Sequence, residues 1–155
     1  MIFVAVGTTD FDALIAEMDR IAPTLEEKVV MQIGNGQCIP QNAEYFRFAP
    51  SLDQYYEQCD IIVAHGGLGI VMEALERGKK LICVENADTH GGHQRDLLST
   101  LAGERYIIWC RTPSELSEAL ERVKYTELRR YISPGCEIHT IITDFLHKLE
   151  KGGCV

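Results

Sequence analysis

Apolar runs of strand length recur along the chain, separated by turn residues and helical patterns. Most of these runs lack the strict alternation of apolar and polar positions that a half-exposed strand would show. The predicted strands are Ile2–Val6, Val29–Ile33, Tyr45–Phe48, Ile61–Ala64, Leu81–Val84 and Tyr106–Trp109. Continuous apolar runs of this length are typical of strands buried on both faces, so the pattern predicts a parallel sheet covered on both sides.

Helical periodicity lies between most of the predicted strands. Apolar residues at three-and-four spacing form one stripe from Phe11 to Ala22 and another from Leu116 to Val123. The residues TPSEL at the start of the second stripe are typical of a helix start, and the region of Ser114 is a helix-cap signal. Strands that each lead into a helix predict an α/β fold with a Rossmann-like, doubly wound parallel sheet. At 155 residues, the chain fits a single domain spanning 1–155.

The last helical pattern, at 138–150, should form a strongly amphipathic helix. Its broad apolar face comprises Ile138, Ile141, Ile142, Phe145, Leu146 and Leu149. Core packing within the chain is the ordinary explanation of such a face. Contact with a partner subunit is the alternative. The sequence leaves this choice open, and with it the oligomeric state.

Composition narrows the class of partner and the compartment. A formal net charge of -8 and a pI near 5.1 argue against nucleic acid, which needs a basic stripe. The six cysteines are Cys38, Cys59, Cys83, Cys110, Cys136 and Cys154. They form no CxxC pair, which indicates free thiols in a reducing cytoplasm. The sequence shows no targeting segment and no apolar run near the ~18 residues of a membrane span. We therefore expect a cytoplasmic protein without a membrane span of its own.

The stretch HGGLG, from His65 to Gly69, follows a predicted strand and precedes a helical pattern. Glycines there let the backbone approach a ligand, and a helix start offers unpaired N–H groups to a phosphate. Tight packing without a ligand would use the same glycines. The sequence lacks the GxxxxGK[ST] pattern, which excludes a P-loop. The loop therefore allows a phosphate-bearing ligand without specifying one.

Two kinds of nucleotide site are compatible with this loop. The dinucleotide fingerprint GxGxxG is matched only in part, because Met72 stands where the third glycine belongs. Glu85 nevertheless ends the next strand, as a ribose-binding acid of an NAD site would. In a nucleotide-sugar site, a glutamate about one turn into the helix holds the ribose, and Glu73 has that position. Without the loop before it, Glu73 would be an ordinary solvated carboxylate.

Three motifs, in this order, resemble the donor-binding C-terminal domain of the GT-B glycosyltransferases of family 28, to which MurG is related. They are MIFVAVGTTDFDALI, HGGLGIVMEALERGKKLICVEN and HGGHQRDLL. The chain is most similar to small stand-alone members of this family. These are the soluble subunit of the two-part UDP-GlcNAc transferase acting on dolichol-linked sugar, and the PssE-type exopolysaccharide subunits. The resemblance implies a hexosyltransferase subunit that uses a UDP-sugar, with GlcNAc or a related sugar.

The resemblance also implies roles for the residues of the glycine loop. Gly66, Gly67 and Gly69 would frame the diphosphate of the donor. Glu73 would bond the hydroxyls of the ribose. His65 matches the residue with which the family's loop begins.

Further donor-binding roles are implied for residues of two other loops. Gln94 would contact the sugar hydroxyls, with Asn86 and His93 on the same rim. Gly7 and Thr8 would face the cleft from the first loop. On local grounds alone, Asn86 and Gln94 could instead cap the helix that follows.

The resemblance assigns no catalytic residue to this chain and requires neither a metal nor a cofactor. His90 and His93 lie three apart but lack further ligands at a suitable spacing for a metal. The resemblance implies a membrane-anchored partner subunit that binds a lipid-linked acceptor and supplies the general base. The chain would then be peripheral at the membrane through that partner. A dinucleotide-dependent enzyme and a non-catalytic nucleotide-sugar-binding module are the alternatives.

Overall fold

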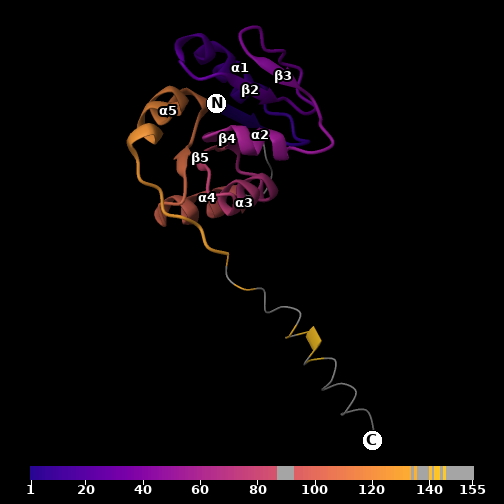
Figure 1. Cartoon of the computed structure of the whole chain (residues 1–155), viewed down its shortest axis with the longest axis vertical. Coiled ribbons are helices and arrows are strands. Elements are labelled where there is room, and N and C mark those ends of the chain that lie inside the picture. The colour runs from indigo at the N-terminus through magenta and orange to yellow at the C-terminus, as the bar shows by residue number, and fades with distance from the viewer. Residues whose placement is uncertain (87–92, 134, 136–139, 141, 144, 146–155) are drawn as a thin grey trace, which may run out of the picture.

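A computed structural model of the chain describes residues 1–86, 93–133, 135, 140, 142, 143 and 145. Its strands form one parallel sheet in the order β3-β2-β1-β4-β5-β6 (Figure 1). The strands are β1 (Ile2–Ala5), β2 (Val29–Gln32), β3 (Glu44–Phe46), β4 (Ile61–His65), β5 (Lys80–Val84) and β6 (Ile108–Cys110). This order is that of a Rossmann fold, so the predicted doubly wound parallel sheet is confirmed.

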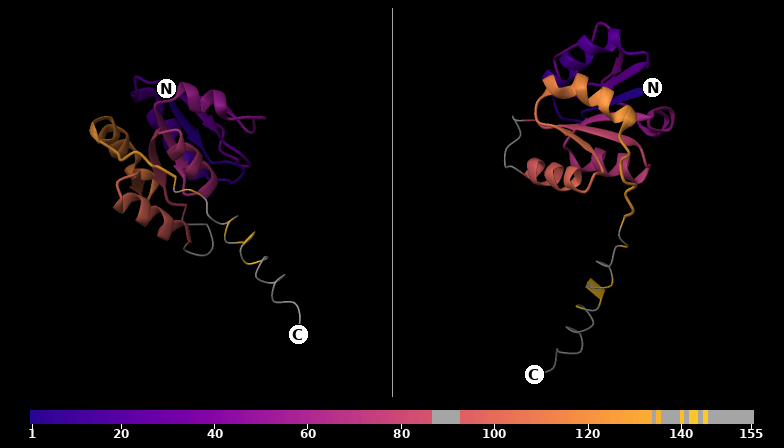
Figure 2. Two further views of the ribbon diagram at one scale, coloured as in Figure 1. Left: turned by 60° about the horizontal axis from the view of Figure 1, so that its bottom comes forward. Right: turned by 90° about the vertical axis from the view of Figure 1, so that its left-hand side faces the viewer.

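Helices cover both faces of this sheet (Figure 2). They are α1 (Asp12–Ile21), α2 (Asp53–Gln58), α3 (Leu68–Glu76), α4 (His93–Gly103) and α5 (Leu116–Tyr125), with 3₁₀ turns at Ala22–Thr24 and Pro113–Glu115. The apolar faces of α1 and α5 pack on one side of the sheet, and α2, α3 and α4 pack on the other. Both stripes predicted for α1 and α5 are buried as expected.

Two cores, one on each side of the sheet, explain why the strands lack alternation. Along β1, Ile2 and Val4 point into the core beneath α1 and α5. Phe3 and Ala5 point into the core beneath α2, α3 and α4. Since all four side chains are buried, each position in the strand has to be apolar.

Four of the predicted strands differ from the observed bounds by one residue, and the other two, β3 and β6, differ by two residues at one end. Pairing of β3 with β2 stops at Phe46, where the predicted strand continued to Phe48. The Arg47 side chain turns toward the loop after β2, and its Nη1 donates to the carbonyls of Gly34 and Gly36 at 3.0 and 2.8 Å. At the opposite edge, β6 begins at Ile108, two residues later than predicted. Both differences lie in edge strands, which pair on one side only.

Two aspartates of α1 anchor the loop between β2 and β3. The Asp12 carboxylate accepts hydrogen bonds from the backbone N–H groups of Gln37 and Cys38 at 2.9 and 3.0 Å. About two helical turns further on, Asp19 accepts from the N–H groups of Gln41 and Asn42 at 3.0 and 2.7 Å. Carboxylates that accept backbone N–H groups form strong hydrogen bonds, so this loop is held firmly against α1.

Other predictions are tested only within the described residues. The cysteines described there, Cys38, Cys59, Cys83 and Cys110, are free thiols. No helix in the described ranges is long and apolar enough to cross a membrane.

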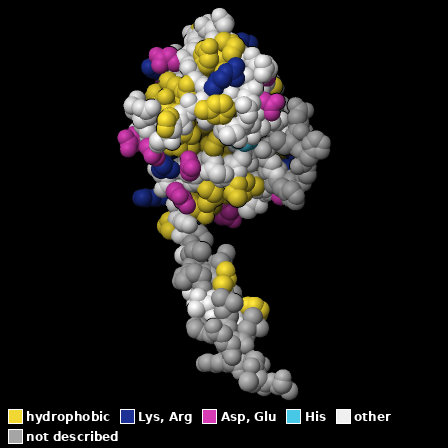
Figure 3. Space-filling view, turned by 90° about the vertical axis from the view of Figure 1, so that its right-hand side faces the viewer, with side chains coloured by type: hydrophobic (Ala, Val, Ile, Leu, Met, Phe, Trp, Pro, Cys, Tyr) yellow, Lys and Arg dark blue, Asp and Glu magenta, His cyan; other side chains and the backbone are white. Residues whose placement is uncertain are grey.

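The face drawn in Figure 3 carries acidic and basic side chains interspersed with apolar ones. The helix predicted at 138–150 lies largely outside the described residues, so it and the single-domain boundary 1–155 stay predictions.

Candidate functional site

The strand order places the ligand-binding crevice expected of such a fold between the ends of β1 and β4. Strands β2 and β3 extend the sheet on one side of β1, and β4, β5 and β6 extend it on the other. In open α/β sheets, ligands bind outside the carboxyl ends of the strands at such a reversal of strand order. The loops that leave β1 and β4 here contain Gly7 and Gly66. The fold therefore points to the two loops that the glycine pattern indicated.

His65, the last residue of β4, lies between these two loops. Gly7 has a φ of +64°, and a Cβ added to it would lie 3.9 Å from His65 Cε1 and 3.2 Å from Ile70 Cδ1. A Cβ added to Gly67 would overlap the His65 Nε2 atom. The imidazole is only 7% exposed, and its Nδ1 atom has no hydrogen-bond partner among the described residues. The absence of a side chain at Gly67 thus makes room for this ring, whereas Gly7 is favoured by its positive φ and its closeness to Ile70.

The enclosed position of His65 affects its protonation. Burial lowers the pKa of His65 below its ordinary value, and a hydrogen bond with the Ala5 backbone opposes this only in part. Because an imidazole has an ordinary pKa near 6.5, the His65 ring is neutral at neutral pH. The side chain therefore offers the crevice a polar but uncharged group.

The lowered pKa of His65 predicts a pH dependence of stability. Below a pH of about 6.5 the unfolded chain binds a proton at this residue more readily than the folded chain. The free energy of unfolding should therefore fall as the pH is lowered from 6.5 toward the folded-state pKa. Urea unfolding at about pH 7.5 and about pH 5.5 should show a larger loss for the wild type than for His65→Gln. Equal losses would mean that the ring is solvated in the folded protein.

Gly66 and Gln94 connect the glycine loop to α4. A Cβ added to Gly66 would overlap Gln94 Cγ and lie 2.9 Å from Leu98 Cδ1. The Gln94 Oε1 atom accepts a hydrogen bond from the backbone N–H of Asn86 at 2.9 Å. The Asn86 side chain in turn reaches the carbonyl of Asp10 in the first loop at 3.4 Å. These contacts bring together the loops that follow β1, β4 and β5, as the three motifs predicted.

The start of α3 faces open space. Gly67 is its N-cap and provides no side-chain hydrogen bond, so among the described residues no side chain caps the start of the helix. A Cβ added to Gly69 would meet nothing within 4 Å. Glu73 is exposed and lies four residues after Gly69, on the same face of the helix. Because helical side chains lean toward the N-terminus, its carboxylate and the helix start border the same space.

The two carboxylates considered for a ribose differ in their surroundings. Glu85 is only 8% exposed, and its Oε1 accepts from Arg95 Nε and Nη2 at 2.9 and 2.6 Å. Both donors bond the same oxygen, and the second, Oε2, is buried without a hydrogen-bond partner among the described residues. Glu73 has an exposed side chain beside the open helix start. The structure therefore favours Glu73 over Glu85 as a ligand-binding acid.

The remaining predicted residues belong to the loop after β1 and to the start of α4. Thr8 is exposed, and its carbonyl accepts from Asn35 Nδ2 at 2.8 Å. His93 is the first residue of α4, and its side chain lies outside the described part of the chain, as does His90. Within the described ranges, no group of three or more His, Cys, Asp or Glu side chains could hold a metal ion.

Gly34, which the sequence analysis did not identify, packs closely against the backbone of the loop after β1. Its φ is +53°, and a Cβ added to it would lie 2.6 Å from the Gly7 carbonyl oxygen and 2.7 Å from that of Thr9. The only signal in the sequence is a glycine directly after a predicted strand. That signal does not reveal which loop the glycine contacts.

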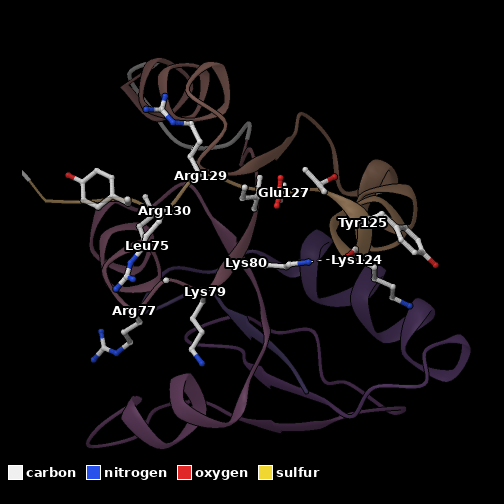
Figure 4. Close-up of a pocket in the computed structure, with 13 residues that line it drawn as sticks. Leu75, Arg77, Lys79, Lys80, Lys124, Tyr125, Glu127, Arg129 and Arg130 are labelled. Atoms are coloured by element: carbon white, nitrogen blue, oxygen red, sulfur yellow. Dashed lines mark hydrogen bonds between the residues drawn. The ribbon is translucent and has the colours of Figure 1, made fainter.

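A separate cavity of about 610 Å³ lies at the other end of the sheet (Figure 4). Its lining includes six cationic residues: Arg77, Lys79, Lys80, Lys124, Arg129 and Arg130. Five of them have partners within the fold. Lys80 Nζ, for example, donates to the last carbonyls of α5, those of Val123 and Lys124, at 2.9 and 3.1 Å. Lys79 bonds the carbonyl of Cys59, which follows α2. Cations at helix C-termini stabilise the helix dipole, so we attribute this basic cavity to folding.

Sheet and loops together define a Rossmann-like α/β domain with a glycine-lined helix start at the point where the strand order reverses. Residues 1–140 match the model of the glycosyltransferase family 28 C-terminal domain, and the chain belongs to this family. The resemblance inferred from the three motifs is thereby confirmed.

Curated relatives share the same region. The chain is 31% identical over 122 residues to the human protein named UDP-N-acetylglucosamine transferase subunit ALG13, and 32% identical over 121 residues to the mouse protein of that name. Each match covers 70% of this chain, but only 11% of the human protein and 10% of the mouse protein. This chain thus spans about a tenth of these two relatives.

Solved structures show the same fold at low sequence identity. The crystal structure of Acinetobacter baumannii MurG superposes with a TM-score of 0.64 at 20% identity, over 79% of this chain and 40% of that one. An NMR structure of ALG13 gives a TM-score of 0.61 at 15% identity, over 85% of this chain and 89% of that one. These likenesses show that the chain has the Rossmann-like GT-B fold of these proteins.

Proposed function

We propose that this chain is the donor-binding subunit of a glycosyltransferase that moves a hexosyl group, GlcNAc or a related sugar, from a UDP-sugar. The observation that carries the proposal is the start of α3 at the switch point of the sheet. It combines N–H groups without a side-chain cap, open space at Gly69 and an exposed carboxylate at Glu73. Backbone N–H groups suit a diphosphate, and a carboxylate suits the hydroxyls of a ribose.

In this scheme the chain binds the donor and stabilises charge, without forming a covalent intermediate. The diphosphate lies against Gly66, Gly67 and Gly69, with Gly7, Thr8 and His65 on its other side. Negative charge grows on the β-phosphate as the bond to the sugar breaks, and the N–H groups of α3 stabilise that charge. The neutral His65 ring adds a polar group without repelling or neutralising the phosphate. Membership of family 28 supports this assignment.

The sugar of the donor would lie near the loop after β5. Gln94 would bond its hydroxyls, with Asn86 and His93 on the same rim. The contacts of Gln94 with Gly66 and Asn86 support this placement, because they hold its amide between the glycine loop and β5. A side chain fixed at both sides loses little freedom when it binds a ligand.

The acceptor site belongs, in this proposal, to a membrane-anchored partner. The human and mouse relatives are named as subunits of a transferase, which supports a division of labour between chains. The partner would bind a lipid-linked acceptor and supply the general base that removes the proton from its hydroxyl. This chain would then act at the membrane surface through the partner.

Thermal unfolding with a panel of nucleotides tests the proposal. The panel comprises UDP, UDP-GlcNAc, UDP-glucose, GDP-mannose and NAD. Ligand at about a hundred times its Kd adds roughly 2.7 kcal/mol to the free energy of unfolding, which raises the Tm by several degrees. We expect a shift with UDP and its sugars and none with NAD. A shift with NAD alone would support the dinucleotide enzyme instead. If UDP-sugar binds but no candidate partner and acceptor ever give turnover, the chain is a binding module.

A further inference from the structure

Tyr56, on α2, is a buried tyrosine whose hydroxyl group has no evident function in packing. The residue is 1% exposed, and its ring packs edge-on against Phe3 with centroids 5.7 Å apart. The hydroxyl oxygen is buried and has no hydrogen-bond partner among the described residues. Burying an unpaired hydroxyl costs free energy, and phenylalanine would fill the same space without that cost. The hydroxyl group therefore requires an explanation beyond the core.

Arg77 connects Tyr56 to the helix that carries Glu73. Its guanidinium carbon lies 4.6 Å from the centroid of the Tyr56 ring. Arg77 Nη1 donates to the Glu73 carbonyl at 3.3 Å, and Nη2 donates to Asp53 Oδ1 at 2.6 Å. One side chain thus bridges α2 and α3 at the turn where Glu73 lies. Tyr56 and Glu73 face each other across this junction.

The pKa of Tyr56 also reflects how near its hydroxyl group lies to Glu73. Burial raises the pKa of Tyr56 above its ordinary value, and the charge of the Glu73 carboxylate raises it further. The Arg77 charge acts in the opposite direction. A tyrosine that stays protonated at all ordinary pH values is always available as a hydrogen-bond donor.

We propose that Tyr56 is a positioning residue of the ribose site, whose hydroxyl group donates to one carboxylate oxygen of Glu73 when the nucleotide binds. The other carboxylate oxygen then remains free to accept from the ribose hydroxyls. This inference rests on the proposed function, because it assumes that Glu73 binds a ribose. It adds a residue outside the three motifs and gives the ligand site a means of selecting ribose over deoxyribose.

The physical reason is the freedom of an exposed glutamate side chain. Glu73 has three rotatable bonds, and its side chain is exposed. Holding it in one orientation costs side-chain entropy that weakens ligand binding. A buried donor beside it favours the orientation in which one oxygen points toward α2 and the other toward the start of α3. The free energy lost by burying the hydroxyl unpaired is recovered when the ligand fixes this arrangement.

Calorimetric titration of the full chain with UDP, 2′-deoxy-UDP and 3′-deoxy-UDP tests the inference. In Tyr56→Phe, UDP affinity should fall about tenfold, while the affinity for at least one deoxy-nucleotide changes little, so that discrimination decreases. The Tm without ligand should stay the same or rise, because an unpaired buried hydroxyl has been removed. In a Glu73→Gln background, Tyr56→Phe should have little additional effect.

Tyr55→Phe is the matched control, since Tyr55 lies on the same helix and stacks on Phe46 with centroids 4.5 Å apart. It should bind all three nucleotides as the wild type does. Unchanged discrimination in Tyr56→Phe, or an equal loss for all three nucleotides, would overturn the inference while the proposed function stands. If the wild type bound none of the nucleotides, the proposed function would fail and the inference with it.

Discussion

Replacing Gly34 with alanine is expected to lower the free energy of unfolding by about 3 kcal/mol. Two effects add at this position. The left-handed backbone, with a φ of +53°, is unfavourable for any residue with a Cβ. The added carbon would also lie 2.6 and 2.7 Å from the carbonyl oxygens of Gly7 and Thr9, and backbone atoms cannot rotate away as a side chain would. Urea unfolding measures the loss directly.

Gly78→Ala is the matched control for this prediction. Gly78 has a φ of +66°, but a Cβ there would meet nothing within 4 Å. The free energy of unfolding of the control should therefore fall only by the cost of a Cβ in the left-handed backbone conformation, about 1 kcal/mol. Equal losses in the two variants would show that the first loop yields to the added carbon without strain.

The same substitution connects stability to the ligand site. Gly34 contacts the loop that carries Gly7, and Gly7 in turn borders the His65 ring. If the first loop moves to relieve the contact, the crevice changes shape where the diphosphate is proposed to bind. The fraction of Gly34→Ala protein that folds should therefore bind UDP more weakly than Gly78→Ala.

The sheet could be predicted from the sequence because each strand is buried on both faces. Ile2–Ala5 contributes alternate side chains to two separate cores, so the run is apolar throughout and the parallel arrangement follows. The edge strands were predicted less well. At β3 the end is set by Arg47, which binds carbonyls of a loop more than ten residues away in sequence. No local pattern encodes such a contact.

Part of the site could likewise be predicted from local sequence, and part depends on contacts between elements that are distant in sequence. Gly66, Gly67 and Gly69 lie on one strand-loop-helix unit, so their spacing alone indicated the helix start. The choice between Glu73 and Glu85 was left open, because both lie near that loop in sequence. The ion pair that Arg95 of α4 forms with Glu85 decides between the two carboxylates. No helical or strand pattern in the sequence predicts this pair. The support proposed for Glu73 from Tyr56 would likewise act between two helices.

The second large effect concerns Glu73, whose substitution by glutamine is expected to weaken UDP binding about a hundredfold. A carboxylate that accepts hydrogen bonds from two ribose hydroxyls makes charge-assisted bonds of about 1.5–3 kcal/mol each. Glutamine keeps one acceptor oxygen and loses the charge, so a loss near 2.7 kcal/mol, or a factor of about 100, is expected. The Tm without ligand should barely change, because Glu73 is exposed.

Glu76→Gln and Glu85→Gln distinguish this expectation from its alternatives. Glu76 is exposed on the last turn of α3, away from the helix start, so its variant should bind UDP as the wild type does. Glu85→Gln removes the carboxylate that pairs with Arg95, so it should lower the Tm while leaving a smaller effect on UDP affinity than Glu73→Gln. If Glu85→Gln abolished nucleotide binding and Glu73→Gln did not, the ribose would lie at the end of β5, as in a dinucleotide site. Calorimetric titration of the three variants with UDP therefore decides which carboxylate the crevice uses.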